Sequence, residues 1–310
     1  MMTAAEIDAL RSKNYNATAV SIRLANPELM VLRVKPDFLI PSYKMGQYST
    51  LGMGHWEPRA PDCQPEEPKP GEDVKLIRRA YSISHPILND EVKLVEDGEL
   101  TYLEFYIVLV RWADKEPPAL TPRLFTLKPG DRLYLGEKIA GHYNLDPVKP
   151  TDNVVFLSTG TGEAPHNSMT WDLLRHGHTG RILSACCVRY KRDLAYLETH
   201  DVLMERYPNY KFLSLTTREV HNLDHKVYIQ DLITSGQLEE FLGAKLNPEN
   251  AHVYLCGNPK MIGVPNVDRA TGATSFPQPP GVIELLAAKG FRVDQHAQKL
   301  RGTIHFEEYW

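Results

Sequence analysis

The second half of the chain alternates short apolar runs with segments of helical pattern, and this alternation is the feature that most limits the fold. The runs of strand character are NVVFLSTG, RILSACCVRY, YKFLSLTTR and HVYLCG. The helical segments are APHNSMTWDLLRHG, DLAYLETHDVLMERYP, QDLITSGQLEEFLG and GVIELLAAKG. Continuous apolar runs of this length are typical of strands buried on both faces. The pattern predicts an α/β doubly wound parallel sheet.

The first half has a different character, because strand-like runs follow one another with little helical pattern between them. These runs are ATAVSIRLA, ELMVLRVKP, LTYLEFYIVLVRW and DRLYLGEKI, and PRLFTL is a short helix candidate. Successive strands without helices predict an antiparallel barrel or sandwich. The pattern changes near DPVKPTDN, and 310 residues suit two domains better than one. We therefore expect domains at residues 1–147 and 148–310.

Two irregular segments interrupt these patterns. His55–Lys75 is rich in proline and acidic residues, which is typical of an exposed loop or flap. Val264–Gly281 lies between the last strand-like run and the last helical segment of the alternating half. Both are insertions in an otherwise regular pattern.

Composition excludes several classes of function. A formal net charge of −4 gives no global electrostatic reason to bind nucleic acid or an anionic membrane. The longest apolar run, near Phe105–Val110, is far too short to span a bilayer, and the N-terminus lacks a signal-peptide core. We expect a soluble, cytoplasmic protein.

The cysteines indicate neither a disulfide framework nor a metal site. The chain has four, none in a CxxC pair: Cys63, Cys186, Cys187 and Cys256. A structural zinc or an iron–sulfur cluster needs several closely spaced ligands. We expect reduced thiols and no bound metal.

Unusual residues follow the predicted parallel strands, and ligands of an open α/β sheet bind beyond the carboxyl ends of the strands. STGTGEAP has glycines between a strand and a helix, where backbone N–H groups can approach a phosphate. Arg189 and Arg218 each follow a strand and, with Lys226 and Tyr228, could clamp a phosphate. The residues alone leave open a tight turn, a small core cysteine at Cys256 and ordinary surface charge.

Two further stretches could serve a flat ligand. In RRAYSIS, strand alternation would place Arg79 and Tyr81 on one face and Ser82 on the other. The chain finishes in GTIHFEEYW, and two terminal aromatic rings are costly to leave in water. This tail either packs into the core or covers something flat.

Four motifs in order give the chain a resemblance to a known family. RAYS, GTGxAP, CGNPxM and a tail of the form H-x-E-x-Y-W, with EFYIVLV and LTPRL between the first two, resemble the ferredoxin/flavodoxin–NADP reductases. The Trp after the terminal Tyr resembles the bacterial branch, whereas KVYIQ resembles the plant type. The resemblance implies an N-terminal antiparallel β-barrel that holds FAD and a C-terminal α/β domain that holds NADP(H).

The resemblance also implies an FAD site. Arg79 would contact the FAD phosphate, Tyr81 would pack on one flavin face and Ser82 would hydrogen-bond near the reacting nitrogen. Tyr309 would stack on the other flavin face and Trp310 on the adenine. The implied FAD set is Arg79, Ala80, Tyr81, Ser82, Tyr106, Ile107, Val108, Leu109, Ala119, Leu120, Thr121, Thr161, Tyr309 and Trp310.

The implied NADP site combines the glycine turn with the cations, which favour NADP over NAD because a 2′-phosphate needs charge pairing. Its residues are Gly160, Gly162, Ala164, Pro165, Arg189, Thr217, Arg218, Lys226, Tyr228, Gln230, Cys256 and Gly257. The implied catalytic residues are Ser82, Cys256, Glu307 and Tyr309.

The resemblance therefore implies a ferredoxin/flavodoxin–NADP reductase that acts as a monomer on a ferredoxin or flavodoxin. One alternative is the reductase component of an oxygenase system. Another is a non-catalytic flavin-binding sensor, which would keep the FAD motifs and lose the nicotinamide site.

Overall fold

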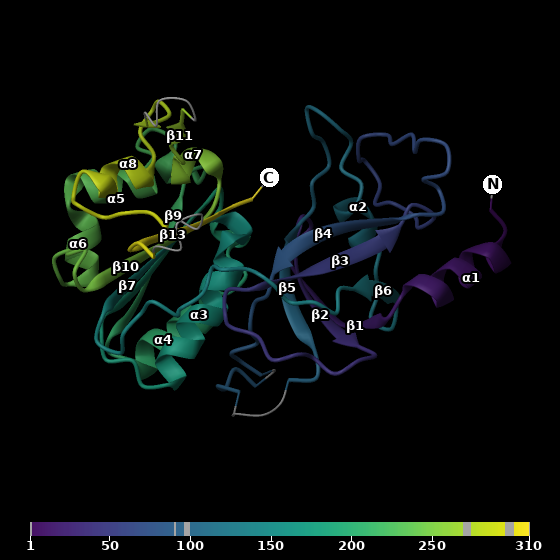
Figure 1. Cartoon of the computed structure of the whole chain (residues 1–310), viewed down its shortest axis with the longest axis horizontal. Coiled ribbons are helices and arrows are strands. Elements are labelled where there is room, and N and C mark those ends of the chain that lie inside the picture. Colours follow the sequence, from purple (N-terminus) through teal and green to yellow (C-terminus); the bar gives the residue numbers. More distant parts are fainter. Residues whose placement is uncertain (1, 90, 96–99, 269–273, 295–300, 310) are drawn as a thin grey trace. The chain divides into compact units, whose positions relative to one another are not determined.

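The chain is organised as two compact units. The computed structural model describes residues 2–89, 91–95, 100–268, 274–294 and 301–309. The first unit, here the barrel unit, comprises the described residues of Met1–Asn89 and Lys93–His142 (Figure 1). The second, the sheet unit, comprises those of Asp90–Val92 and Tyr143–Trp310. The chain thus leaves the barrel unit between His142 and Tyr143. The domain boundary at residues 147 and 148 stays a prediction.

The barrel unit is built on a six-stranded antiparallel sheet in the order β4-β3-β6-β1-β2-β5. Strands β4 and β5 end this order, and Ser84, just after β4, forms an antiparallel bridge with Glu104 of β5. The Ser84 N–H donates to the Glu104 carbonyl oxygen over 2.8 Å, which closes the sheet. Its elements are α1 (Ala4–Asn14), β1 (Ala17–Asn26), β2 (Leu29–Pro36), β3 (Tyr48–Gly54), β4 (Leu76–Ser82), β5 (Leu103–Val108), α2 (Thr121–Leu124) and β6 (Arg132–Leu135).

The predicted fold of the first half, an antiparallel β-barrel, is therefore confirmed. Apolar side chains at alternate strand positions fill the interior, as the period of two requires. The most deeply buried include Met30, Leu32, Leu51, Phe105 and Leu133.

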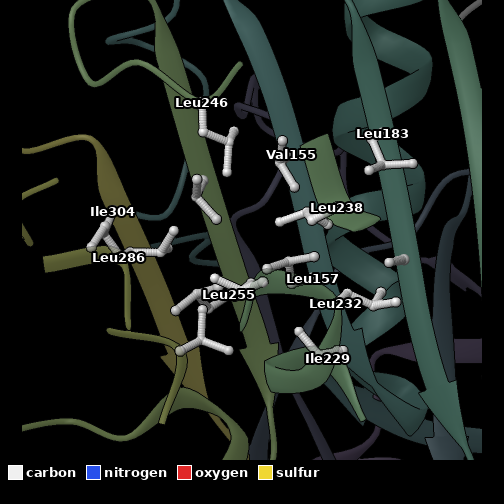
Figure 2. Packing of buried hydrophobic residues seen from close by; sticks show 14 of the residues in the cluster. Val155, Leu157, Leu183, Ile229, Leu232, Leu238, Leu246, Leu255, Leu286 and Ile304 are labelled. Atoms are coloured by element: carbon white, nitrogen blue, oxygen red, sulfur yellow. The ribbon is translucent and has the colours of Figure 1, made fainter. Parts of the chain in front are cut away.

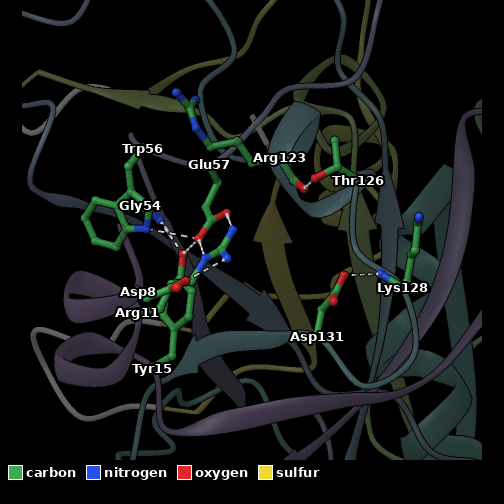
Figure 3. Close-up of polar contacts among 10 residues, drawn as sticks. All are labelled: Asp8, Arg11, Tyr15, Gly54, Trp56, Glu57, Arg123, Thr126, Lys128 and Asp131. Carbon is green, nitrogen blue, oxygen red and sulfur yellow. Dashed lines mark hydrogen bonds and ion pairs between the residues drawn. The ribbon is translucent and has the colours of Figure 1, made fainter. Parts of the chain in front are cut away.

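Sequence patterns did not predict two elements of the barrel unit. Helix α1 has no buried residue, and a capping box between Thr3 and Glu6 starts it. Its Arg11 donates from Nε and Nη2 to the buried carboxylate of Glu57 over 2.8 and 2.6 Å. The Tyr15 hydroxyl and the Trp56 indole donate to the same carboxylate over 2.9 and 3.0 Å (Figure 3). Strand β3, YSTLGMG, is the other element.

The sheet unit contains a five-stranded parallel sheet in the order β13-β10-β7-β8-β9, which confirms the predicted fold of the second half. Its strands are β7 (Asn153–Thr159), β8 (Ile182–Val188), β9 (Tyr210–Thr216), β10 (Ala251–Gly257) and β13 (Ile304–Glu308), and a small pair is β11 (Asn266–Val267) and β12 (Thr274–Ser275). Its helices are α3 (Glu163–Arg175), α4 (Leu197–Arg206), α5 (Ile229–Ser235), α6 (Gln237–Leu242), α7 (Pro259–Ile262) and α8 (Val282–Ala287), with single 3₁₀ turns at Gly160–Gly162, Lys191–Asp193 and Val220–Asn222.

Helices cover both faces of this sheet (Figure 1). Figure 2 shows the face on which Val155, Leu157 and Leu255 of the strands meet α5, α6 and α8. The next residues along each strand, such as Phe156 and Tyr254, point to the other face, where the α3 residue His166 lies 5.0 Å from the Phe156 ring. Burial on both faces explains why these strands read as continuous apolar runs.

Two predicted helices differ from those observed. QDLITSGQLEEFLG was expected to be one helix, but Gly236 adopts φ 82° and divides it into α5 and α6. The segment DLAYLETHDVLMERYP was also expected to be helical throughout, but a 3₁₀ turn ends at its first residue, Asp193, and helix α4 begins only at Leu197. A left-handed backbone at glycine ends a helix because no Cβ opposes it.

The tail is the edge strand of the sheet. Strand β13 pairs in parallel with β10, and Ile304 and His305 are buried. The tail therefore belongs partly to the core, with Glu307 and Tyr309 beyond the buried part. Among the described residues, no helix has the length and apolar character needed to cross a membrane.

Candidate functional site

The barrel seam brings together the first group of predicted FAD residues. Strand β4 carries Arg79, Ala80, Tyr81 and Ser82, of which Arg79 and Ala80 are exposed and Ser82 is buried. The antiparallel bridge between Ser84 and Glu104 turns the end of β4 towards β5. The second group follows Glu104: Tyr106, Ile107 and Val108 lie in β5, and Leu109 comes directly after the strand.

The third predicted group joins the second through side-chain contacts. The Val110 N–H donates to Thr121 Oγ1 over 3.1 Å, which links the end of β5 to the start of α2. Ala119 and Leu120 precede this threonine, and the Ala119 carbonyl oxygen accepts from Arg123 over 2.7 Å. All three groups therefore occupy connected segments of the barrel unit.

The proline-rich insertion His55–Lys75 lies along the same segments. The Gln64 N–H donates to the Arg111 carbonyl oxygen over 2.8 Å, and the Arg111 guanidinium donates to the Pro61 carbonyl oxygen over 2.7 Å. Glu66 accepts from the buried Arg123 over 2.6 Å, with Arg59 at 3.6 Å from the same carboxylate. The first part of the insertion, up to Glu66, is thus held against residues 109–123.

In the sheet unit, two glycine-containing strand ends press against each other. A Cβ atom at Gly162 would lie 2.6 Å from the Cys256 carbonyl carbon, and Gly257 has φ 125°, with Thr159 backbone where a Cβ would be. The Asn258 N–H donates to Thr159 Oγ1 over 2.7 Å and ties the two ends together. Only glycine allows backbones to approach this closely.

Strand register sets Cys256 beside the tail. Cys256 of β10 is the partner of Glu307 in β13, and the Tyr309 N–H donates to the Gly257 carbonyl oxygen over 2.9 Å. Burial raises the pKa of the Cys256 thiol well above its usual value, and the Glu307 charge adds to this. Cys256 is therefore a neutral thiol, beside an acid and a phenol at the carboxyl edge of the sheet.

Two of the predicted cations, Arg189 and Arg218, follow neighbouring strand ends. The Arg218 N–H donates to the Arg189 carbonyl oxygen over 2.8 Å, and Thr217 Oγ1 donates to the Val188 carbonyl oxygen over 3.2 Å. Lys226 and Tyr228 are exposed on the segment that enters α5. Gln230 donates to the Lys260 carbonyl oxygen over 3.4 Å, just after the Cys256–Gly257 strand end.

Comparison with known proteins identifies the family. The family model described as "Oxidoreductase NAD-binding domain" matches residues 156–265 of this chain. Flavodoxin/ferredoxin–NADP reductases of Shigella flexneri and Escherichia coli K12 are each 34% identical over 194 residues, which cover 61% of this chain and 71% of theirs. The chain belongs to the flavodoxin/ferredoxin–NADP reductase family.

Solved structures agree with the fold of this family. A ferredoxin–NADP reductase of Neisseria gonorrhoeae with bound FAD and NADP matches with TM-score 0.67 at 20% identity, covering 95% of this chain and 98% of that one. A ferredoxin–NADP reductase of Plasmodium falciparum matches with TM-score 0.63 at 18% identity, covering 96% and 97%. Both structures share the fold of this chain.

The sheet edge suits a dinucleotide. Gly160 has φ 54° with open space where a Cβ would project, and the N-terminus of α3 has no side-chain cap. The Glu163 N–H already donates to the Gly160 and Thr161 carbonyl oxygens and Pro165 has no N–H, so this helix start would attract a phosphate mainly through its dipole. The barrel seam likewise offers an exposed Arg79 beside the half-buried Tyr81, which are donor and ring types that suit a flavin nucleotide.

The structure divides the predicted residues between the units. The FAD groups at 79–82, 106–109 and 119–121 lie in the barrel unit, and Thr161 and Tyr309 lie in the sheet unit with the whole NADP set. Trp310 lies outside the described residues. No group of three or more His, Cys, Asp or Glu side chains in the described ranges is arranged to hold a metal ion.

Sequence reasoning missed two side chains that hold the predicted ones. Asp193, itself buried, lies 3.4 Å from Nε of Arg189. Thr159 Oγ1 fixes the strand end that carries Gly257. Arg189 and Asp193 are four residues apart, so their contact could have been predicted from the sequence. Thr159 and Asn258 are far apart in the sequence, and no local pattern indicates that they meet.

Proposed function

We propose that the chain exchanges electrons between NADP(H) and a ferredoxin or flavodoxin, with FAD as its resident cofactor. The observation that supports this most directly is the pairing of Cys256 with Glu307 beside the Gly160–Gly162 turn. Relatives named flavodoxin/ferredoxin–NADP reductase share 34% identity with the chain. Bound FAD would couple two-electron hydride chemistry to single-electron transfer.

In this proposal the chain's own residues bind and orient the reacting groups. Arg79 pairs with the FAD phosphate, Tyr81 and Tyr309 cover the flavin, and Ser82 offers a hydroxyl to the reacting edge. Glu307 orients and buffers proton transfer near that edge, while neutral Cys256 packs against the nicotinamide without competing as a nucleophile. Arg189, Arg218 and Lys226 select the 2′-phosphate of NADP(H).

Absorption spectroscopy of the purified protein tests the proposal. We expect a flavin spectrum that bleaches on anaerobic mixing with NADPH and far more slowly with NADH. A matched pair of variants, Arg218→Ala and Lys211→Ala, separates a site cation from an exposed lysine of β9. Only the first should lose the preference for NADPH, and a colourless protein that takes up no FAD would overturn the assignment.

The electron acceptor distinguishes the alternatives. Rapid reoxidation by a ferredoxin or flavodoxin supports the proposed reaction. Reoxidation only by an oxygenase component would favour the oxygenase reductase. A flavin that NADPH leaves oxidised would favour a sensor.

We also propose that the protein acts as a cytoplasmic monomer. All four cysteines are unpaired, as expected of a reducing compartment. Light scattering of the FAD-loaded protein and fractionation of cells test the two statements separately.

A further inference from the structure

The first part of the proline-rich insertion contacts both ends of one loop of the barrel unit. This part, residues 55–66, is called the brace here. The loop, residues 111–118, lies in the connection between β5 and α2. The predicted FAD residues lie on either side of it, at 106–109 and 119–121. The contacts of the brace form two sets, one at each end of the loop.

The first set lies where the loop leaves β5. The Arg111 guanidinium donates to the Pro61 carbonyl oxygen over 2.7 Å. The Gln64 N–H donates to the Arg111 carbonyl oxygen over 2.8 Å, and the side-chain Oε1 of Gln64 accepts from the Ala113 N–H over 3.0 Å. Three hydrogen bonds therefore fix residues 111–113 to the brace.

The second set lies where the loop reaches α2. The Arg59 guanidinium donates to the Pro118 carbonyl oxygen over 2.9 Å. The Ala60 N–H donates to the Pro122 carbonyl oxygen over 2.8 Å. Because these two prolines flank residues 119–121, the brace holds that short predicted FAD segment at both of its ends.

Glu66 completes the second set through a buried ion pair. Arg123, whose side chain is 3% exposed, donates from Nη1 to Glu66 Oε2 over 2.6 Å. The same guanidinium donates to the Ala119 carbonyl oxygen over 2.7 Å and to the His55 carbonyl oxygen over 3.0 Å. Nε of Arg59 lies 3.6 Å from the same Glu66 oxygen. One carboxylate thus orients both guanidinium groups that contact this end of the loop.

These contacts bear on how much freedom the loop loses when a ligand binds. Residues 112–116 are all exposed, so burial of apolar side chains does not fix their backbone. Ordering a loop on binding costs conformational entropy for each residue that becomes fixed. A loop that is already held at both ends loses less of this entropy. The brace should therefore raise the affinity of the adjoining segments for their ligand.

We propose that the brace preorganises the FAD site, holding residues 109–121 in their binding conformation before the cofactor arrives, and thereby sets the affinity of the protein for FAD. Glu66 is its central positioning residue and acts through Arg59 and Arg123 rather than on the cofactor. The inference rests on the proposed FAD site, and it adds that an insertion outside the FAD motifs governs cofactor affinity.

FAD titration of the full chain freed of cofactor, combined with hydrogen exchange, tests the proposal. The variant is Glu66→Ala, and the matched control is Glu67→Ala, which removes the carboxylate of the exposed neighbour. Glu66→Ala should raise the dissociation constant of FAD on the order of tenfold, because ordering one further loop residue on binding costs about that much affinity. Its amides at residues 109–121 should exchange faster than in the native protein, whereas those of β1 and β2 should not. The control should match the native protein in both measurements.

Gln64→Ala is the second variant, because it removes the acceptor of the Ala113 N–H and leaves the buried Glu66–Arg123 pair in place. It should raise the dissociation constant by a smaller factor and speed exchange mainly near Ala113. If Glu66→Ala speeds exchange across the whole barrel unit, Gln64→Ala decides, and unchanged FAD affinity in it would overturn the inference.

The remaining outcomes separate the inference from the proposed function. Native FAD affinity in both variants, with or without faster exchange at residues 109–121, would overturn the role of the brace and leave the proposed function intact. A native protein that takes up no FAD would instead overturn the proposed function itself.

Discussion

Replacing Gly162 by alanine tests whether the two strand ends of the sheet unit must touch. Gly162 has φ −60° and ψ −12°, so alanine fits its backbone and would favour the helix by up to about 1 kcal/mol. The added Cβ, however, would lie 2.6 Å from the Cys256 carbonyl carbon and 3.0 Å from the Gly257 nitrogen. Carbon atoms in contact normally lie about 3.5–4.0 Å apart, so one strand end must move by roughly 1 Å.

The expected cost follows from this displacement. Adding atoms to a packed site costs about 1–3 kcal/mol, occasionally more. This cost exceeds the stabilisation that alanine gives the helix relative to glycine. We expect Gly162→Ala to lower the melting temperature by several degrees, at roughly 2–4 °C per kcal/mol for a domain of this size. Because the turn moves away from the phosphate position, NADP⁺ affinity should fall at least about tenfold.

Differential scanning fluorimetry and NADP⁺ titration of the FAD-loaded protein provide the measurements. Gly177→Ala is the matched control, since Gly177 has φ 74° but open space where the Cβ would project. It should cost about 1 kcal/mol through backbone strain alone and leave NADP⁺ affinity unchanged. If Gly162→Ala were as stable as the native protein with unchanged affinity, the close approach of the strand ends would not matter and the reasoning would be wrong.

Three further predictions concern other parts of the molecule. Glu57→Ala removes the carboxylate that accepts hydrogen bonds from Arg11, Tyr15 and Trp56. This variant should lower the free energy of unfolding of the barrel unit by about 2–4 kcal/mol. Urea unfolding followed by flavin fluorescence measures the change. Burial lowers the pKa of His166 from 6.5 to about 3, so the folded state resists a proton that the unfolded chain accepts. The free energy of unfolding should therefore fall as pH drops below 6.5, by up to about 1.4 kcal/mol per pH unit. In urea titrations at pH 7 and 5, His166→Phe should show a smaller pH dependence of the free energy of unfolding. An unchanged pH dependence would refute this. Tyr309→Ser should bind NADP⁺ more tightly and turn over more slowly, because the ring proposed to cover the flavin is removed. Unchanged NADP⁺ binding on titration would contradict that covering role.

The sequence predicted those elements whose burial leaves a local pattern. Strands β7, β8 and β10 read as continuous apolar runs because helices cover both of their faces. The glycine turn was visible because two glycines separate a strand from a helix. Both signals lie within fewer than ten residues of chain, which is the range over which pattern and propensity act.

Elements fixed by distant contacts were not predicted. Helix α1 has no apolar face, and a carboxylate 46 residues away holds its Arg11. Strand β3 contains Gly52 and Gly54, which weaken strand propensity, yet a Cβ at Gly54 would collide with Trp56. Glu163 and His200 are 37 residues apart and meet only because α3 and α4 cover the same face of the sheet. In each case tertiary contacts, which one sequence does not display, decided the outcome.

The order of strands in the parallel sheet also bears on how the chain folds during synthesis. Strand β7 lies at the centre, but its neighbour β10 follows only after roughly ninety intervening residues. A ribosome adding about 5–20 residues per second needs roughly 5–20 s to make them. Through that interval the nascent β7 has one unpaired edge, and Val155 and Leu157 lack their helical cover until α5 and α6 have been made. Chaperone occupancy should be greatest in this window.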